Sequence, residues 1–274
     1  MKVILSRKGF DSENGGCPSP ILPDGQMVSM PIPYRGDNCR FDELRFPDGR
    51  DYLAAVEDLR AKEADVFECH LDPDIRKDAR VSVPAGWKPA FGQVNSAEGH
   101  LEKQGVKEGD LFLFFGLFRK TEYRNGKLSF VKGSGKIHAI YGWLQIGQML
   151  RGTQVRNLPW HPHSDDGHIY RANGKLTNNT IYVASDRLKL DGKETGWPGA
   201  GVFPYAEKRV LTTPGASQFS RWKLTGPFGK VPLSYHYDPT RVHDGYFQSV
   251  AKGQEFVFDE NPLVTEWIMS LFGF

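Results

Sequence analysis

Apolar runs and turn residues alternate most clearly between residues 109 and 150. Three apolar runs lie in this stretch, at 111–118, 128–131 and 137–146. The first run is apolar on both faces of a strand, which is typical of a strand inside a sheet. Asn125-Gly126 follows it and favours a tight hairpin turn, because both central residues of a type I′ turn need a positive φ. The pattern therefore predicts a central antiparallel meander over residues 109–150.

The rest of the chain has shorter elements separated by long polar segments. Its pattern predicts strands at 2–5 and 66–70 and helices at 51–62, 95–104 and 262–272. The last helix has the clearest ends, with Asn261 as its N-cap, Pro262 at its first position and Gly273 after its end. The 30 glycines and 18 prolines favour many turns and loops. We therefore expect an α+β fold, a β-rich mixed sheet around the meander with few helices and long loops, in a single domain over residues 1–274.

Composition and charge narrow the possible classes of protein. The formal charge is +2, from 35 basic and 33 acidic residues, so any surface for nucleic acid has to be local. No apolar run reaches the roughly 20 residues of a membrane-spanning helix, and the first residues become polar too early for a signal peptide. The three cysteines are widely spaced and predict a reducing compartment without a disulfide framework. We therefore expect a cytoplasmic protein that does not enter a membrane.

A polar, glycine-rich loop follows the first predicted strand, over residues 6–16. Glycines allow close approach of the backbone to a ligand, and backbone N–H groups with cations can hold a phosphate. No Gly-Lys-Ser/Thr sequence ends the loop, so it is not a Walker A motif. A surface loop held by its own Asx turns remains the alternative. The candidate residues for chemistry or ligand binding in this loop are Ser6, Arg7, Lys8, Asp11 and Ser12.

A second candidate site lies at the end of the strand predicted over residues 66–70. His70, Asp72 and Asp74 follow one another at alternate positions there. Ligands are often bound at the carboxyl ends of strands in α/β sheets. The alternative is that both aspartates only cap the turn around Pro73.

The densest group of potential ligands lies in residues 160–168, which contain three histidines and two aspartates. His161 and His163 are two residues apart, which places both rings on one side of an extended segment. Imidazoles and carboxylates suit Zn, Fe or Mn, although a rigid exposed loop has a similar composition. Trp160 precedes this group, and His138, within the third run of the meander, is a further potential ligand if it faces a cleft.

Five parts of the chain are distinctive: Ser6–Asp11, Gly15–Gly16 with Pro18–Pro20, Gly109–Asp110, Ile137–Gly142 and Gly253–Val257. Together they resemble a known family, called nucleotide modification associated domain 3. The resemblance covers essentially the whole chain and implies an α+β fold. It also implies a context of phage and bacterial systems that make or process modified nucleic-acid bases.

The favoured hypothesis is an enzyme that acts on a nucleotide or a nucleic-acid base, of oxygenase or hydrolase type, with a divalent transition metal (Fe, Mn or Zn) as cofactor. Its metal ligands would be His70, His138, His161 and His163. Lys8, Asp11 and Asp72 would take part in catalysis. Ser6, Arg7, Ser12 and Trp160 would bind the substrate.

Two other hypotheses remain open from the sequence. A non-catalytic reader of modified bases in DNA or RNA would stack a base on aromatic residues such as Trp143, Trp160 or Trp197. In a purely structural protein, the histidines would be scattered, with no shared site near Asp11. Scattered histidines would distinguish the structural protein from the enzyme, whereas nucleic-acid binding that weakens steeply with salt would mark the reader.

Overall fold

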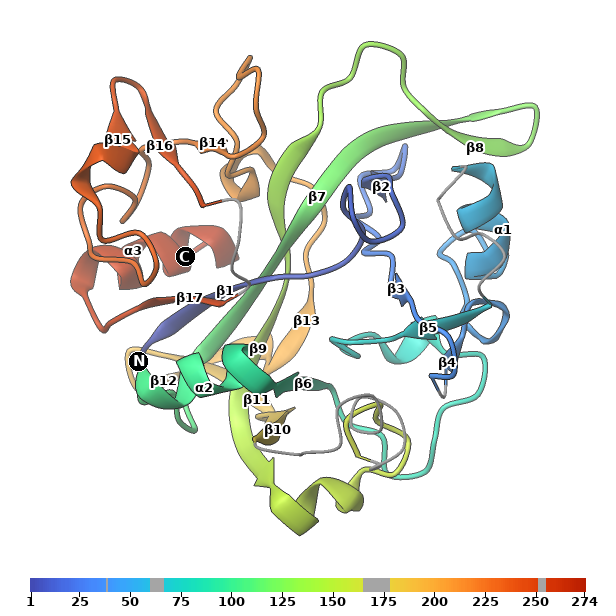
Figure 1. The fold of residues 1–274 in the computed structure, drawn as a ribbon, viewed down its shortest axis with the longest axis horizontal. Helices are drawn as coiled ribbons and strands as arrows, with labels where there is room; N and C mark the ends of the chain where they lie inside the picture. The colour runs from blue at the N-terminus through green and yellow to red at the C-terminus, as the bar shows by residue number, and fades with distance from the viewer. Residues whose placement is uncertain (38, 60–66, 165–177, 251–254) are drawn as a thin grey trace.

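The protein is described by a computed structural model over residues 1–37, 39–59, 67–164, 178–250 and 255–274. Its centre is a pair of long antiparallel strands, β7 (Leu111–Arg124) and β9 (Ile137–Arg151), which cross the middle of Figure 1. They belong to a nine-stranded mixed sheet whose main order is β17-β1-β7-β9-β10-β6. The expected α+β fold with a β-rich mixed sheet is confirmed.

The remaining elements are short. The other strands of the large sheet are β1 (Val3–Arg7), β2 (Ser19–Ile21), β6 (Ala90–Val94), β8 (Lys127–Phe130), β10 (Asn179–Ala184), β13 (Ala200–Val202) and β17 (Glu255–Phe258). Three small sheets contain β3 (Ile32–Pro33), β4 (Cys39–Arg40) and β5 (Glu68–His70); β11 (Arg187–Leu190) and β12 (Lys193–Pro198); and β14 (Arg221–Trp222), β15 (Val242–His243) and β16 (Tyr246–Gln248). The described α-helices are α1 (Tyr52–Asp58), α2 (Asn95–Lys103) and α3 (Pro262–Phe272).

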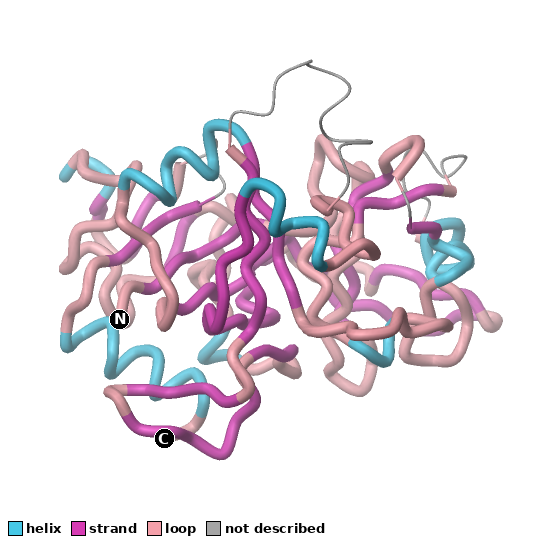
Figure 2. The backbone as a smooth tube through the Cα atoms, turned by 90° about the horizontal axis from the view of Figure 1, so that it is seen from below, coloured by secondary structure: helices cyan, strands magenta, loops and turns pink. Residues whose placement is uncertain are grey.

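Five short 3₁₀ turns complete the described secondary structure: η1 (Phe41–Glu43), η2 (Lys77–Ala79), η3 (Gly152–Asn157), η4 (Glu207–Arg209) and η5 (Pro239–Arg241). Figure 2 shows the strands grouped in the middle of the molecule and the helices toward its outside. In the described part of the chain, no helix combines the length and the apolar character that crossing a bilayer requires.

Both faces of β7 are buried, as its apolar sequence predicts. Leu113 and Phe115 face a core cluster that also contains Ile268 of α3. Phe112 and Phe114, which point to the opposite face, pack in a second cluster with Phe91 of β6. Phe91 lies edge-on to both phenylalanines, with ring centroids 5.0 and 5.3 Å away. The alternation of side chains along one strand thus supplies two separate cores.

The expected hairpin turn is present, but the pairing within residues 109–150 differs from a simple meander. Asn125 and Gly126 have φ values of 52° and 76°, as a type I′ turn requires. Both β8 and β9 pair with β7, at residues 121–124 and 111–118 respectively. The loop over residues 131–136 therefore connects β8 and β9, which together form one long antiparallel partner of β7. Apolar runs and turns predict strands, but they do not decide whether a loop reverses the chain.

The ends of α1 and α3 follow their sequence signals. The Asn261 side chain accepts a hydrogen bond from Leu263 N at 2.9 Å, and Gly273 ends α3 with φ of 91°. The Asp51 side chain caps α1 by accepting from Ala54 N at 2.8 Å. Residues 60–62, the expected end of this helix, lie outside the described residues.

Strand β1 lies between two partners that are distant in the sequence. It runs parallel to β7 on one side and antiparallel to β17 on the other. The pairing with β17 places Ser6 opposite Glu255. Because neighbouring strand residues point to opposite faces, Ser6 and Lys8 share one face of the sheet and Arg7 points to the other.

Candidate metal centre

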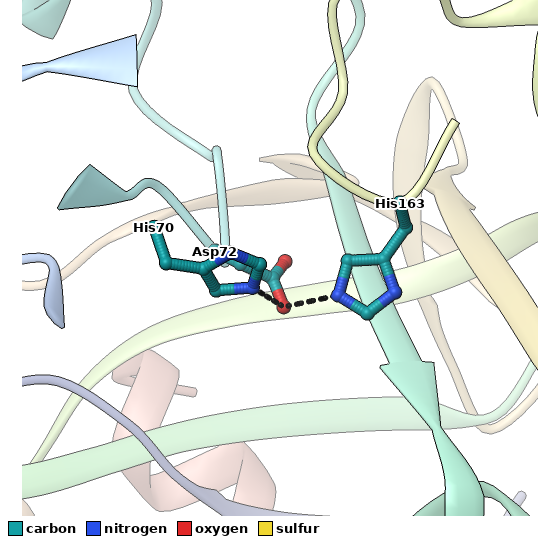
Figure 3. Close-up of side chains that lie close together, drawn as sticks. All are labelled: His70, Asp72 and His163. Atoms are coloured by element: carbon teal, nitrogen blue, oxygen red, sulfur yellow. Dashed lines mark ion pairs between the residues drawn. The ribbon is translucent and has the colours of Figure 1, made fainter. Parts of the chain in front are cut away.

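His70 and Asp72 are brought together by the end of β5. His70 is the last residue of the strand, and a tight turn follows in which Asp72 N donates to His70 O at 3.0 Å. Gly92 of β6 fixes the carboxylate by donating its N–H to Asp72 Oδ1 at 2.9 Å. The His70 and Asp72 side chains both point into the region between β5 and β6 (Figure 3).

His163 reaches the same place from the segment between η3 and β10. Its Nε2 lies 3.7 Å from Asp72 Oδ2, and His70 Nε2 lies 3.9 Å from the same oxygen (Figure 3). The potential ligand atoms of His70, Asp72 and His163 all lie within 4.8 Å of one another. We call these three residues the metal triad. Three ligand atoms at this spacing can surround a single ion.

Gly92 makes room for the triad. A Cβ atom at this position would lie 2.3 Å from His163 Cγ and 2.4 Å from Cδ2, far inside van der Waals contact. A glycine inside a strand often marks such a close approach. The backbone of β6 therefore both holds Asp72 and accepts the His163 ring against its surface.

The outer nitrogen of each triad histidine is held by an acceptor. His70 Nδ1 lies 2.7 Å from Asp37 Oδ2, so this nitrogen carries the proton of the neutral ring. His163 Nδ1 lies 3.1 Å from Asn179 Oδ1. The amide nitrogen of Asn179 donates to His163 O at 2.8 Å, so its Oδ1 is the atom that accepts from the ring. Both neutral rings therefore direct an Nε2 lone pair at Asp72, which is the arrangement of a metal-binding histidine with its outer partner.

Burial sets the protonation states of Asp72 and His163. It raises the pKa of Asp72 to about 6, against the opposing effects of His70 and Lys8. Burial, together with the neighbouring His70, holds the pKa of His163 well below its usual value. At neutral pH Asp72 is thus a carboxylate and the His163 imidazole is neutral, the forms that bind metal ions. Two imidazoles and one carboxylate fit Zn in a catalytic site and non-haem Fe(II).

His161 and Trp160 also lie at this centre. His161 Nε2 is 3.7 Å from Asp72 Oδ1, and the ring is fully buried. The Trp160 ring neighbours His161, with centroids 5.7 Å apart. The Arg80 guanidinium lies 5.6 Å over the Trp160 ring. His161 and Trp160 therefore both border the triad.

Lys8 and Ser6 approach the centre from β1. Lys8 Nζ lies 3.2 Å from Glu255 Oε1 and 4.4 Å from the centre of the Phe91 ring. Its charge lowers the pKa values of Asp72 and His163, so it is close to the triad. Ser6 Oγ and Gln93 Nε2 donate to the same Glu255 oxygen, at 3.1 and 2.6 Å. A buried polar cluster thus borders the triad.

The other candidates lie elsewhere. Asp11 Oδ1 accepts the backbone N–H groups of Glu13 and Asn14, both at 2.8 Å, which is the Asx turn of the surface-loop alternative. Ser12 in the same loop is exposed. Arg7 points to the other face of the sheet, where its charge contributes to the lowered pKa of His138.

His138 is part of a core rather than of the triad. Its Nδ1 accepts a hydrogen bond from Trp222 Nε1 at 3.0 Å, and its ring lies edge-on to Phe115 and Phe219. Burial lowers the pKa of His138 to about 3. The alternation of β9 directs this residue to the core that contains α3, away from Asp72. The residues Asp165, Asp166 and His168 of the histidine-rich segment lie outside the described residues.

Sequence reasoning missed four residues of this site: Asp37, Gly92, Asn179 and Glu255. The glycine inside an otherwise apolar strand was a usable signal for Gly92. Asp37 and Asn179 lie in unremarkable sequence, and Glu255 lies in a segment that carries the family resemblance without marking a site. Only the fold brings them to the histidines and to Lys8.

The fold and the site define an α+β protein with a buried centre of two histidines and one aspartate. The chain belongs to the family described as nucleotide modification associated domain 3, which matches residues 2–259. The family description associates the domain with nucleotide modification. Searches of curated proteins and of solved structures find no match.

Proposed function

We propose that the protein is a metal-dependent enzyme that acts on a nucleotide or on a base in nucleic acid. The observation that carries this proposal is the pair of Nε2 lone pairs of His70 and His163, both directed at the buried Asp72 carboxylate. A divalent ion held by these three residues would activate water or dioxygen. Family membership supports the substrate class, because the description of the family refers to nucleotide modification.

The residues around the triad have distinct tasks in this proposal. Asp37 and Asn179 hold the two imidazoles in the tautomer that binds an ion. Lys8 carries a largely buried ammonium group beside the triad and would neutralise an anionic group of the substrate. Trp160 would contact the base near His161.

A small cavity adjoins the triad at Asp72. Its volume is about 40 Å³, and its wall includes Ser29, Ile75 and Tyr141. This volume suits roughly two or three water molecules and is too small for a nucleobase. In the proposed enzyme the cavity supplies a small reactant to Asp72, and the base approaches from another side.

Metal analysis of the purified protein, followed by variants, tests the proposal. We expect about one equivalent of a divalent transition metal in the wild-type protein and a loss of it in His70→Ala, Asp72→Ala and His163→Ala. His243→Ala is the matched control, because His243 is an exposed histidine stacked on Tyr246. Wild-type protein that takes up no Zn, Fe or Mn even when these are added would refute the metal-dependent enzyme.

The reaction is tested separately with the metal-loaded protein. Nucleotides, DNA and RNA are incubated with it, with and without dioxygen, and the nucleosides are analysed by mass spectrometry. We expect a mass change that His163→Ala abolishes and His243→Ala retains. Binding of modified bases without any conversion would support the reader instead.

The aromatic residues give little support to a reader. Trp143 and Trp197 pack edge-on against each other with centroids 5.4 Å apart, and both contact Phe272 of α3. They therefore cover the core and leave Trp160 as the tryptophan of the three that lies beside the triad.

A further inference from the structure

His161 is a buried histidine with a hydrogen-bonding group that no described residue pairs. Its Nδ1 accepts the backbone N–H of His163 at 3.1 Å. A nitrogen that accepts this bond must carry a lone pair, so the proton of the neutral ring sits on Nε2. A ring whose Nδ1 accepts a hydrogen bond is neutral, because the cationic ring carries a proton on both nitrogens.

The Nε2–H group of His161 has no hydrogen-bond partner among the residues that the structure describes, although its atom is fully buried. Such an unpaired donor costs about 1–3 kcal/mol, so we expect it to have an acceptor in the working protein. The nearest acceptor that the structure gives is Asp72 Oδ1, at 3.7 Å. Oδ1 also accepts from Gly92 N and has a second lone pair for His161.

The tautomer of His161 is opposite to that of the triad histidines. His70 and His163 are protonated at Nδ1 and direct a lone pair at Asp72, whereas His161 directs a proton there. A metal ion binds a lone pair and is repelled by an N–H group. His161 therefore faces the same carboxylate as the two ligands but lacks the electron pair that a ligand needs.

We propose that His161 is a positioning residue that donates from Nε2 to Asp72 Oδ1 while Asp72 Oδ2 and the two triad histidines hold the ion. This inference rests on the proposed function. Its consequence is that the residues the structure describes supply three ligands instead of four. Four protein ligands close a metal site and are typical of structural zinc, whereas three leave a position for water or substrate, as in catalytic sites. The His161 tautomer thus makes this an open site.

Nuclear magnetic resonance of ¹⁵N-histidine-labelled wild-type protein tests the tautomers directly. Two-bond ¹H–¹⁵N spectra distinguish a ring protonated at Nδ1 from one protonated at Nε2, and Zn²⁺ is a diamagnetic probe. The spectrum of His161→Gln assigns the His161 signals. On addition of Zn²⁺ we expect the His70 and His163 Nε2 signals to shift strongly while His161 keeps its Nε2 proton. Loss of that proton on Zn²⁺ binding would show that His161 is a fourth ligand and would overturn the inference.

Affinity for Zn²⁺ provides a second measurement. His161→Phe keeps a ring of similar shape but removes the donor, and we expect its affinity to fall about 10–100-fold, as for other outer partners of metal ligands. His161→Gln retains an N–H donor and should lose less. An unchanged affinity in a folded His161→Phe protein would overturn the positioning role. Absence of any Zn²⁺ response in the wild-type histidine signals would instead count against the proposed function itself.

Discussion

Replacing Gly92 with alanine tests whether the backbone of β6 shapes the metal triad. The new Cβ atom would lie 2.3 Å from His163 Cγ, whereas ordinary contacts begin at 3.4 Å, so the ring has to move by about 1 Å. Ligand positions in metal sites are defined to about 0.2 Å, so this shift is several times the tolerance. The Gly92 N–H group still holds Asp72, because the substitution leaves the backbone donor in place.

We expect Gly92→Ala to weaken Zn²⁺ binding at least about 100-fold, at the upper end of the loss caused by misplacing a ligand from outside the coordination sphere. Crowding of the strand should also lower the free energy of unfolding by about 1–3 kcal/mol. Calorimetric titration with Zn²⁺ measures the first effect, and urea denaturation of the metal-free protein measures the second.

Gly135→Ala is the matched control, because Gly135 lies in an exposed loop and its Cβ would meet nothing within 4 Å. Its Zn²⁺ affinity and stability should equal those of the wild type within error. If Gly92→Ala binds Zn²⁺ as tightly as Gly135→Ala does, the role of His163 as a ligand is refuted.

Three further predictions concern partners, pH and metal removal. Asp37→Ala should weaken Zn²⁺ binding about 10–100-fold, measured by the same titration, because His70 loses the acceptor for its Nδ1 proton; Asp42→Ala, at an exposed turn, should not. The pKa of His138 is lowered from 6.5 to about 3, so below pH 6.5 the unfolded chain binds a proton that the folded protein does not, and stability falls as pH falls. The buried neutral His138 thus lowers the free energy of unfolding by about 3 kcal/mol at pH 4.5. Urea denaturation should show that this free energy falls less between pH 7 and 4.5 in His138→Gln than in the wild type. Chelation should lower the free energy of unfolding by about 3 kcal/mol relative to protein with Zn²⁺ at 100 times its dissociation constant, seen as a lower melting temperature; an equal melting temperature with and without Zn²⁺ would contradict binding to the folded state.

The strongest local patterns in the sequence predict the fold. The run that begins at Leu111 is apolar at every position, and the structure buries it on both faces. The cap at Asn261 and the turn at Asn125-Gly126 depend only on neighbouring residues, so they are readable without the rest of the chain. The pairing of β1 with β7 and β17 joins segments more than 100 residues apart, and no local pattern specifies it.

The candidate site is predicted from the sequence only in part. His70, Asp72 and His163 belong to two segments that the sequence marks by their density of ligand-type side chains, and the structure brings them together. His138 looked equivalent to them by residue type, yet the alternation along β9 directs it to Trp222. Residue type and spacing identify possible ligands, whereas the face on which a strand places them decides which ones meet.

The same limit applies to Glu98, which follows Asn95 at the start of α2 by three positions, the spacing of a capping box. The structure buries this carboxylate, which accepts hydrogen bonds from Thr180 Oγ1 at 2.6 Å and Tyr182 Oη at 2.7 Å. A contact across more than 80 residues replaces the local one, because the hydroxyl groups of β10 lie directly beside the helix. The helix forms as expected, but its acidic residue serves the packing of the sheet.

The position of β1 has a consequence for protein synthesis. The ribosome makes β1 before both of its neighbours in the sheet, which are residues 111–115 and 255–258. Strand β1 therefore has no parallel partner until β7 has been synthesised, about a hundred residues later. Its other edge has no antiparallel partner until β17 has been synthesised. Lys8 meets Glu255 only at that stage. The polar cluster beside the triad is thus complete only once Glu255 has been made, so a nascent chain that stalls before residue 255 carries the triad residues without this carboxylate.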